Sequence, residues 1–168
     1  MSVDAIPQDE VDRLIDAWKR ERPDVDVAPL AVMSRVSRLA KHVDTARKHA
    51  FESHDLEVWE FDVLAALRRA GEPYRLSPGQ LGAQTLVTSG TMTNRIDRLE
   101  SKGYVVRRPD PDDRRGVQVE LTPPGRDCVD GALDDLLESE RALLEGLLAS
   151  EQRELASLLR SLTQQFVS

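Results

Sequence analysis

Apolar side chains recur along the 168-residue chain with helical spacing in most stretches. In residues 8–22, for example, Val11, Leu14, Ile15 and Trp18 fall on one face of a helix. The same spacing predicts further helices over residues 30–53, 57–70, 78–85, 88–102, 123–148 and 150–166. Short apolar runs predict strands at residues 74–76, 104–106 and 117–121. The pattern therefore indicates a mainly α fold with a small β-hairpin.

The middle of the chain has the plan of a winged helix-turn-helix, in which a second helix is followed by a hairpin. Thr88 is a suitable N-cap for that helix, and Met92, Ile96 and Leu99 form its inward face. A lysine and a glycine at 102–103 end it. The two strands that follow enclose a turn of prolines, aspartates and arginines. A unit of this kind places a helix in the major groove of DNA and its wing against the minor groove.

Several spaced motifs in this segment agree with one known family. They are Ser89 to Thr93, Arg98-Leu99-Glu100 before Gly103, and the wing residues Asp113, Arg115, Val119, Leu121 and Thr122. This segment resembles the multiple antibiotic resistance regulator (MarR) family. The similarity runs over most of the chain, from about Ala28 to the C-terminus. The resemblance implies a winged helix-turn-helix in an all-helical dimerisation frame. It also implies a homodimeric transcriptional regulator that represses its target from a palindromic operator on double-stranded DNA.

The expected DNA contacts lie on the outward face of the helix over residues 88–102 and at the tip of the hairpin. They are Ser89, Gly90, Thr91, Asn94, Arg98, Asp113, Arg114 and Arg115. Asn94 can bridge an adenine, and Arg98 can bind guanine or a phosphate. By the resemblance, Arg115 is the wing arginine that enters the minor groove, where a guanidinium fits the negative potential. The alternative is an ordinary solvated helix face beside a charged turn.

The distribution of charge favours DNA contact in the same segment, although the net charge of the chain is −7. Residues 88–116 hold seven Lys/Arg and five Asp/Glu, a net +2, whereas residues 1–26 and 130–168 have net charges of −4 and −5. Local charge governs phosphate contact, and acidic ends limit non-specific binding. The basic excess therefore coincides with the predicted recognition helix and wing.

The C-terminal helices carry more leucine than a small winged-helix core can cover. The leucines are Leu133, Leu136, Leu137, Leu143, Leu144, Leu147, Leu148, Leu155, Leu158, Leu159 and Leu162. Ser150 is expected to cap the last helix, with Glu151 in its first turn. The two helices either pack on each other or interlock with those of a second subunit, and the resemblance favours the dimer. We expect residues 1–54 to serve ligand binding and dimerisation, 55–122 to bind DNA, and 123–168 to dimerise.

A second set of residues resembles the urate-responsive branch of the family, which has an added N-terminal helix with a tryptophan. The set is Trp18, Asp62, Arg95 and Arg107. The resemblance implies that a small anion such as urate binds between the Trp18 ring and Arg107, and that Asp62 ties Arg95 to the dimer body. Core packing and surface ion pairs are the alternative explanation of each residue.

Other function classes find little support in the sequence. There is no phosphate loop, nucleophile elbow or paired-cysteine metal motif, so we expect neither enzymatic activity nor a cofactor. The acidic N-terminus, the single cysteine and the lack of an apolar span predict a cytoplasmic protein without a membrane partner. Metal sensing by His42, His49 and His54, oxidation of Cys128, and constitutive DNA binding without ligand stay open as alternatives.

Overall fold

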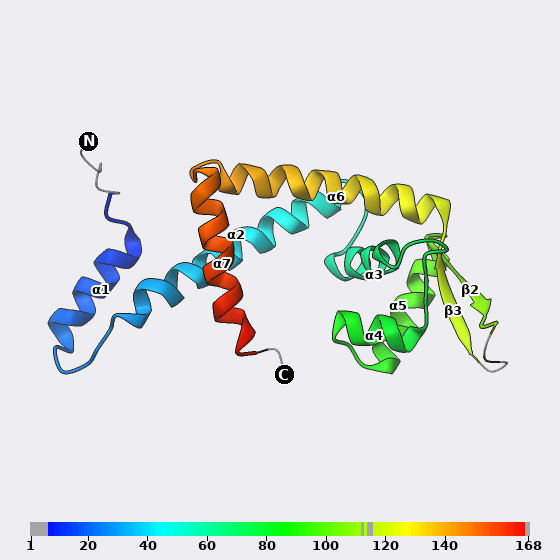
Figure 1. Ribbon diagram of the computed structural model, residues 1–168, viewed down its shortest axis with the longest axis horizontal. Coiled ribbons are helices and arrows are strands. Elements are labelled where there is room, and N and C mark those ends of the chain that lie inside the picture. Colours follow the sequence, from blue (N-terminus) through cyan, green and yellow to red (C-terminus); the bar gives the residue numbers. More distant parts are fainter. Residues whose placement is uncertain (1–6, 112, 114–115, 167–168) are drawn as a thin grey trace. The chain divides into compact units, whose positions relative to one another are not determined.

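The computed structural model describes residues 7–111, 113 and 116–166 (Figure 1). The chain divides into two units, residues 1–45 and 46–168, and helix α2 (Pro29–Glu52) contributes to both. The first unit also holds α1 (Glu10–Glu21). The second unit holds α3 (Val58–Arg69), β1 (Arg75–Leu76), α4 (Pro78–Thr85), α5 (Ser89–Ser101), β2 (Val105–Pro109), β3 (Val117–Leu121), α6 (Pro123–Leu144) and α7 (Ala149–Gln164).

In the first unit, α1 is fixed at its start and along one face. Asp9 is its N-cap, and its carboxylate accepts a hydrogen bond from the backbone N–H of Asp12 at 2.9 Å. The Asp12 carboxylate accepts a second bond from the Asp9 N–H at 3.0 Å. Arg35 of α2 forms ion pairs of 2.8 Å with both carboxylates. The small apolar cluster beneath consists of Val11, Ile15 and Val27. The helix that apolar spacing predicts over residues 8–22 is therefore present as α1.

The core of the second unit is built from the end of α2, from α3 and α4, from the inner face of α5, and from the sheet and α6. Phe51 of α2 stacks on Phe61 of α3, with ring centroids 4.2 Å apart. The three residues that helical spacing placed on the inside of α5 are at most 1% exposed: Met92, Ile96 and Leu99. This burial fixes which face of α5 remains available to solvent.

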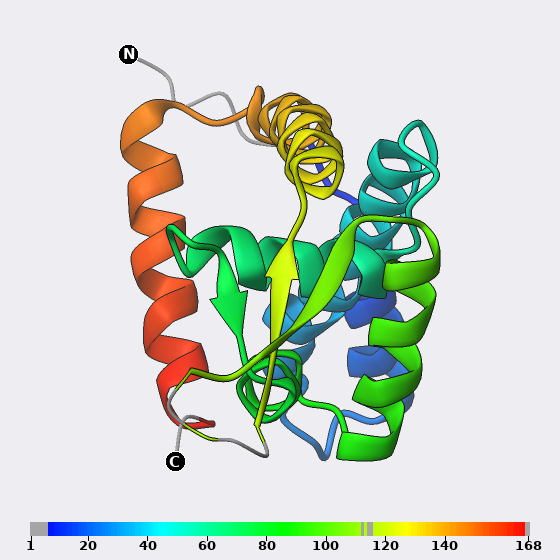
Figure 2. The ribbon, with the colours of Figure 1, turned by 90° about the vertical axis from the view of Figure 1, so that its right-hand side faces the viewer.

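The sheet has three antiparallel strands in the order β1-β3-β2, and Figure 2 shows β3 between the other two. Arg75 of β1 pairs with Glu120 of β3, and the β2–β3 hairpin runs from the Val105–Leu121 pair to the Pro109–Val117 pair. β2 thus begins one residue later than predicted and continues further toward the turn. The hairpin is the wing of a winged helix-turn-helix.

A junction of glycines and one threonine joins α5, the wing and α6. Gly103 has a φ of +76°, which glycine adopts without strain. Thr122, the N-cap of α6, donates to the Gly103 carbonyl at 2.7 Å and accepts from the Gly125 N–H at 3.1 Å. A Cβ on Gly125 would lie 2.1 Å from the Tyr104 carbonyl oxygen, so only glycine fits there. The root of the wing is therefore tied to the end of α5.

The boundaries of the last two helices correct the sequence prediction. α6 ends at Leu144, earlier than the predicted residue 148, ahead of Gly146, whose helix propensity is low. The N-cap of α7 is Leu148 and not the predicted Ser150, because Glu151 accepts the Leu148 N–H at 2.7 Å. α7 has no buried residue. The large apolar side chains that α6, α7 and the segments beside them expose are Leu133, Leu137, Leu143, Leu144, Leu147, Leu148, Leu158, Leu159 and Phe166.

The predicted fold class is confirmed: the chain is mainly helical, with a small three-stranded antiparallel sheet. In the described part of the chain, no helix combines the length and the apolar character that crossing a membrane requires. The three-part functional division at residues 54 and 122 stays a prediction.

Candidate nucleic-acid interface

The N-terminal half of α5 presents the predicted DNA-contacting residues to solvent. Thr88 is the N-cap, as predicted, and its hydroxyl accepts the Thr91 N–H at 3.4 Å. Ser89, Gly90, Thr91 and Asn94 are all exposed. A Cβ on Gly90 would meet no heavy atom within 4 Å, so the backbone there is open to a close approach. This end of the helix also carries the positive end of the helix dipole, which favours a phosphate.

Arg98 lies further along α5 and is already engaged in this DNA-free chain. Its guanidinium forms an ion pair with Glu57, which immediately precedes α3. The same guanidinium lies 4.8 Å from the ring centroid of Trp59, whose indole N–H donates to the second Glu57 oxygen at 2.7 Å. The Trp59 hydrogen bond and then Arg98 lower the pKa of Glu57, so this carboxylate is charged at neutral pH. Sequence reasoning did not identify Glu57 or Trp59.

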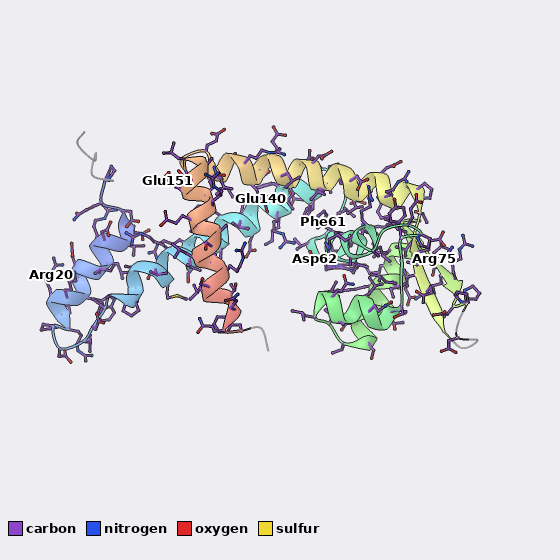
Figure 3. All side chains as sticks on the ribbon, viewed as in Figure 1. Arg20, Phe61, Asp62, Arg75, Glu140 and Glu151 are labelled. Carbon is purple, nitrogen blue, oxygen red and sulfur yellow. The ribbon has the colours of Figure 1, made fainter. Side chains whose placement is uncertain are left out.

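Arg95 and Asp62 have different neighbours from those expected. The Arg95 guanidinium lies 5.2 Å from the Trp59 ring centroid. Asp62, labelled beside Phe61 on α3 in Figure 3, pairs with Arg47 of α2 at 2.9 Å. The Arg47 and Asp62 side chains are only partly exposed, and this strengthens the attraction between their opposite charges. Within the described residues, the structure therefore ties Asp62 to α2 and not to the recognition helix.

Arg107, on β2, is bound to the recognition helix by two carboxylates. Its side chain pairs with Asp97 and with Glu100 of α5, and its backbone N–H donates to Glu100 at 3.0 Å. Burial acts to lower the pKa of Arg107, but the hydrogen bonds with Asp97 and Glu100 outweigh it and raise the pKa. A ligand that binds Arg107 must therefore compete with groups on the recognition helix itself.

A buried carboxylate holds the other end of α5. Glu60 of α3 is 0% exposed and accepts a hydrogen bond from the Lys102 ammonium at 2.9 Å. Lys102 is the C-cap residue of α5 and also donates to the Asp55 carbonyl at 2.8 Å. The pKa of Lys102 is raised: burial acts to lower it, but Glu60 and Asp55 outweigh that effect. Glu57, the N-cap of α3, and Trp59 and Glu60 in its first turn therefore contact α5 and its C-cap residue.

The wing turn is shaped by backbone hydrogen bonds at its base. The Gly116 N–H donates to the Asp113 carbonyl at 2.8 Å, and the Asp110 N–H donates to the Gly116 carbonyl at 3.0 Å. A Cβ on Gly116 would lie 2.8 Å from the Cβ of Asp110, so the turn requires glycine. The predicted DNA contacts Arg114 and Arg115 lie outside the described residues. Asp113 is exposed within this turn.

Trp18 lies on α1 in the first unit, and its side chain is 48% exposed. Its predicted role in ligand binding stays a prediction. The other three residues of the predicted ligand set lie in the second unit, where each has the separate partners described above.

His49, His54 and Cys128 show ordinary contacts. His54 lies 2.9 Å from Asp135 of α6 and lowers the pKa of that carboxylate, and His49 lies 3.5 Å from Glu52. Burial raises the pKa of the Cys128 thiol, which disfavours the reactive thiolate. Among the residues that the structure describes, no three His, Cys, Asp or Glu side chains are grouped as metal ligands would be.

Comparison with known proteins agrees with this geometry. The model of the MarR family matches residues 54–116. The transcriptional regulator PecS from Dickeya dadantii is 36% identical over 159 residues, which cover 95% of this chain and 96% of PecS. A cysteine-to-serine mutant of MarR from Escherichia coli has a similar structure, with 30% identity and a TM-score of 0.60 over 75% of this chain and 94% of that one.

A further solved structure concerns ligand control of DNA binding. It is that of BpsR from Bordetella bronchiseptica, which is 27% identical, with a TM-score of 0.63 over 78% of this chain and 92% of that one. That structure addresses the regulation of BpsR binding to DNA by 6-hydroxynicotinic acid.

Proposed function

Because this chain belongs to the MarR family of DNA-binding transcriptional regulators, we propose that it is a homodimeric repressor that a small anion such as urate releases from a palindromic operator. The observation that carries the DNA-binding part is the exposed N-terminal face of α5 beside a hairpin wing. Ser89, Gly90, Thr91 and Asn94 contact bases and nearby phosphates in this proposal, and Arg98 contacts guanine or a phosphate.

The apolar surface of the C-terminal helices supports dimerisation. α7 buries none of its residues, and Leu148 and Leu158 are 70% and 62% exposed. Exposed apolar area of this kind is stabilised when a second subunit covers it. A twofold dimer presents two recognition helices, and these read half-sites about 10 bp apart in a palindrome.

Ligand control is proposed to act through Arg107. An anion at this guanidinium attracts it away from Asp97 and Glu100, which lie on the recognition helix. The helix then loses two of the contacts that hold it against the wing. A ligand shifts this equilibrium only if it binds the released form more tightly than the DNA-bound form. 6-Hydroxynicotinic acid, named with BpsR, shares with urate a flat ring that can carry negative charge.

The proposed ligand set also includes Trp18, Asp62 and Arg95. Trp18 offers an aromatic face for a flat heterocycle, and its fluorescence would report on a nearby ligand. Arg95 and Asp62 are proposed to affect coupling through their partners Trp59 and Arg47. Asp62→Asn is expected to keep the fold and to weaken the link between ligand binding and DNA release.

The test uses a DNA duplex that the wild-type protein selects from a random-sequence library. Urate is titrated while DNA binding and tryptophan fluorescence are measured. We expect urate to release the duplex from wild-type protein, and Arg107→Ala to bind DNA without responding to urate. Arg108→Ala is the matched control, since Arg108 is the next residue on β2, is exposed, and pairs with Glu120. An unaltered urate response in Arg107→Ala would show that this site assignment is wrong.

A further inference from the structure

Two arginines of the recognition helix share one aromatic ring on a neighbouring helix. The guanidinium carbons of Arg95 and Arg98 lie 5.2 and 4.8 Å from the Trp59 ring centroid. Trp59 is partly buried and packs against the core of the second unit, so its ring is held in place. A fixed ring beneath two flexible side chains restricts where both charges can lie.

Stacking and hydrogen bonding use different parts of a guanidinium. The flat face lies against the ring, while the five N–H donors point outward in the plane of the group. An arginine that stacks on Trp59 therefore keeps donors for a DNA phosphate. In this chain, however, one edge of Arg98 is occupied by the Glu57 carboxylate, which a phosphate must replace.

We propose that Trp59 is a positioning residue that holds Arg95 and Arg98 for contact with DNA phosphate, and that Glu57 masks Arg98 until a phosphate replaces it. The inference rests on the proposed role of Arg98 in DNA binding. Two neighbouring side chains thus have opposite effects on affinity: Trp59 strengthens DNA binding and Glu57 weakens it.

The charges and exposures fit this exchange. Glu57 and Arg98 side chains are each 55% exposed, and an exposed ion pair is weak enough for a phosphate to displace. When a phosphate replaces Glu57 at Arg98, the Glu57 carboxylate keeps its hydrogen bond from the Trp59 indole N–H at 2.7 Å, and water can reach the rest of the carboxylate. The exchange therefore leaves no buried charge without a partner.

The experiment measures the affinity of full-length variants for the duplex selected by the wild-type protein, over a series of salt concentrations. Trp59→Leu removes the ring and is expected to weaken binding about tenfold, the combined effect of two exposed cation–π contacts. Trp59→Phe keeps an aromatic face and is expected to bind within about threefold of wild type. Glu57→Gln is expected to bind a few-fold more tightly, because it removes the competing charge. Circular dichroism and thermal unfolding check that each variant is folded.

A double-mutant cycle separates positioning from a merely structural role. In an Arg95→Ala/Arg98→Ala background, Trp59→Leu should change DNA affinity less than about twofold. Tighter or unchanged binding by Trp59→Leu, weaker binding by Glu57→Gln, or an equal loss in the arginine-free background would each overturn the inference. If the arginine-free variant itself binds DNA like wild type, the proposed DNA face is wrong, and this result is distinct from the others.

Discussion

The Lys102 ammonium lies 2.9 Å from the carboxylate of Glu60, which has no solvent exposure. The same carboxylate oxygen accepts the Glu57 N–H at 2.9 Å, while the other oxygen, also buried, has no hydrogen-bond partner in the described structure. Lys102 is thus the one cation paired with this charge among the described residues. The end of the recognition helix is fixed to the start of α3 by this pair.

Lys102→Met is therefore expected to destabilise the fold by about 2–4 kcal/mol, because it leaves a buried charge unpaired. Glu60→Gln should cost less, about 1–2 kcal/mol, since the neutral amide needs no counter-charge. The combined variant should be more stable than Lys102→Met alone. Urea denaturation measures the free energy of unfolding of all three variants.

Lys48→Met, at an exposed lysine on α2, is the control and should change stability by less than about 0.5 kcal/mol. Equal stability of Lys102→Met and this control would contradict the assignment.

Asp9 is expected to give the first unit a pH dependence at low pH. Its pKa is lowered from 3.8 to about 2, first by the side-chain hydrogen bond from Arg35 and then by the backbone hydrogen bond from Asp12. Because the folded pKa lies below the ordinary value, the stabilisation is complete above the ordinary value and is lost as the pH falls through about 2. Carboxyl NMR should find a midpoint near 2 in the wild-type protein.

The matched variants for this titration are two arginines of α2. Arg35→Ala should move the Asp9 midpoint toward 3.8, since it removes the main cause of the shift. Arg38→Ala removes the partner of Glu10 and should leave the Asp9 midpoint in place. A midpoint near 3.8 in the wild-type protein would show that the Asp9–Arg35 pair does not form.

The fold was predictable because burial in helices follows spacing along the chain. The spacing of Met92, Ile96 and Leu99 alone predicts the inner face of α5, and all three are buried. The chemistry and position of Thr88 predict the N-cap that the structure shows. The end of α6 and the start of α7 were less predictable. There, Glu151 caps the Leu148 N–H although Ser150 is the better capping residue by type.

The partners of charged side chains were not predictable from sequence. Different arrangements of the chain would pair Asp62 with different arginines, and only the packing of α2 on α3 selects Arg47. Trp59 gave no signal of its own, because an aromatic residue at the start of a helix is usually read as core. The sequence did contain one clue: Glu57 and Glu60 lie three residues apart and Arg98 and Lys102 four, the two spacings at which side chains share one face of a helix.

The C-terminal helices are expected to form the dimer. Deletion of residues 150–168 should give aggregated or unfolded protein, since an obligate interface resembles a core cut in half. Leu158→Glu is the milder test, because it places a charge on an exposed apolar side chain of α7. Light scattering should find monomer or aggregate for this variant, and dimer for the adjacent control Ser157→Glu. A folded, soluble monomer after the deletion would contradict an obligate interface.

The wing is expected to contribute its arginine to DNA binding. The β2–β3 register ends at Pro109 and Val117, and the hydrogen bonds of Asp110 and Gly116 close the turn. In the sequence, Arg115 immediately precedes Gly116. Arg115→Ala should weaken binding by about 1–3 kcal/mol and reduce the dependence of log affinity on log salt by about one. Arg153→Ala removes the same charge from α7 and is the control, for which we expect both quantities to stay near wild type. A minor-groove guanidinium acts through local potential, so the loss should be larger for a duplex with an A·T-rich flank than for one with a G·C-rich flank. If Arg115→Ala and Arg153→Ala give the same affinity at every salt concentration, Arg115 does not enter the groove.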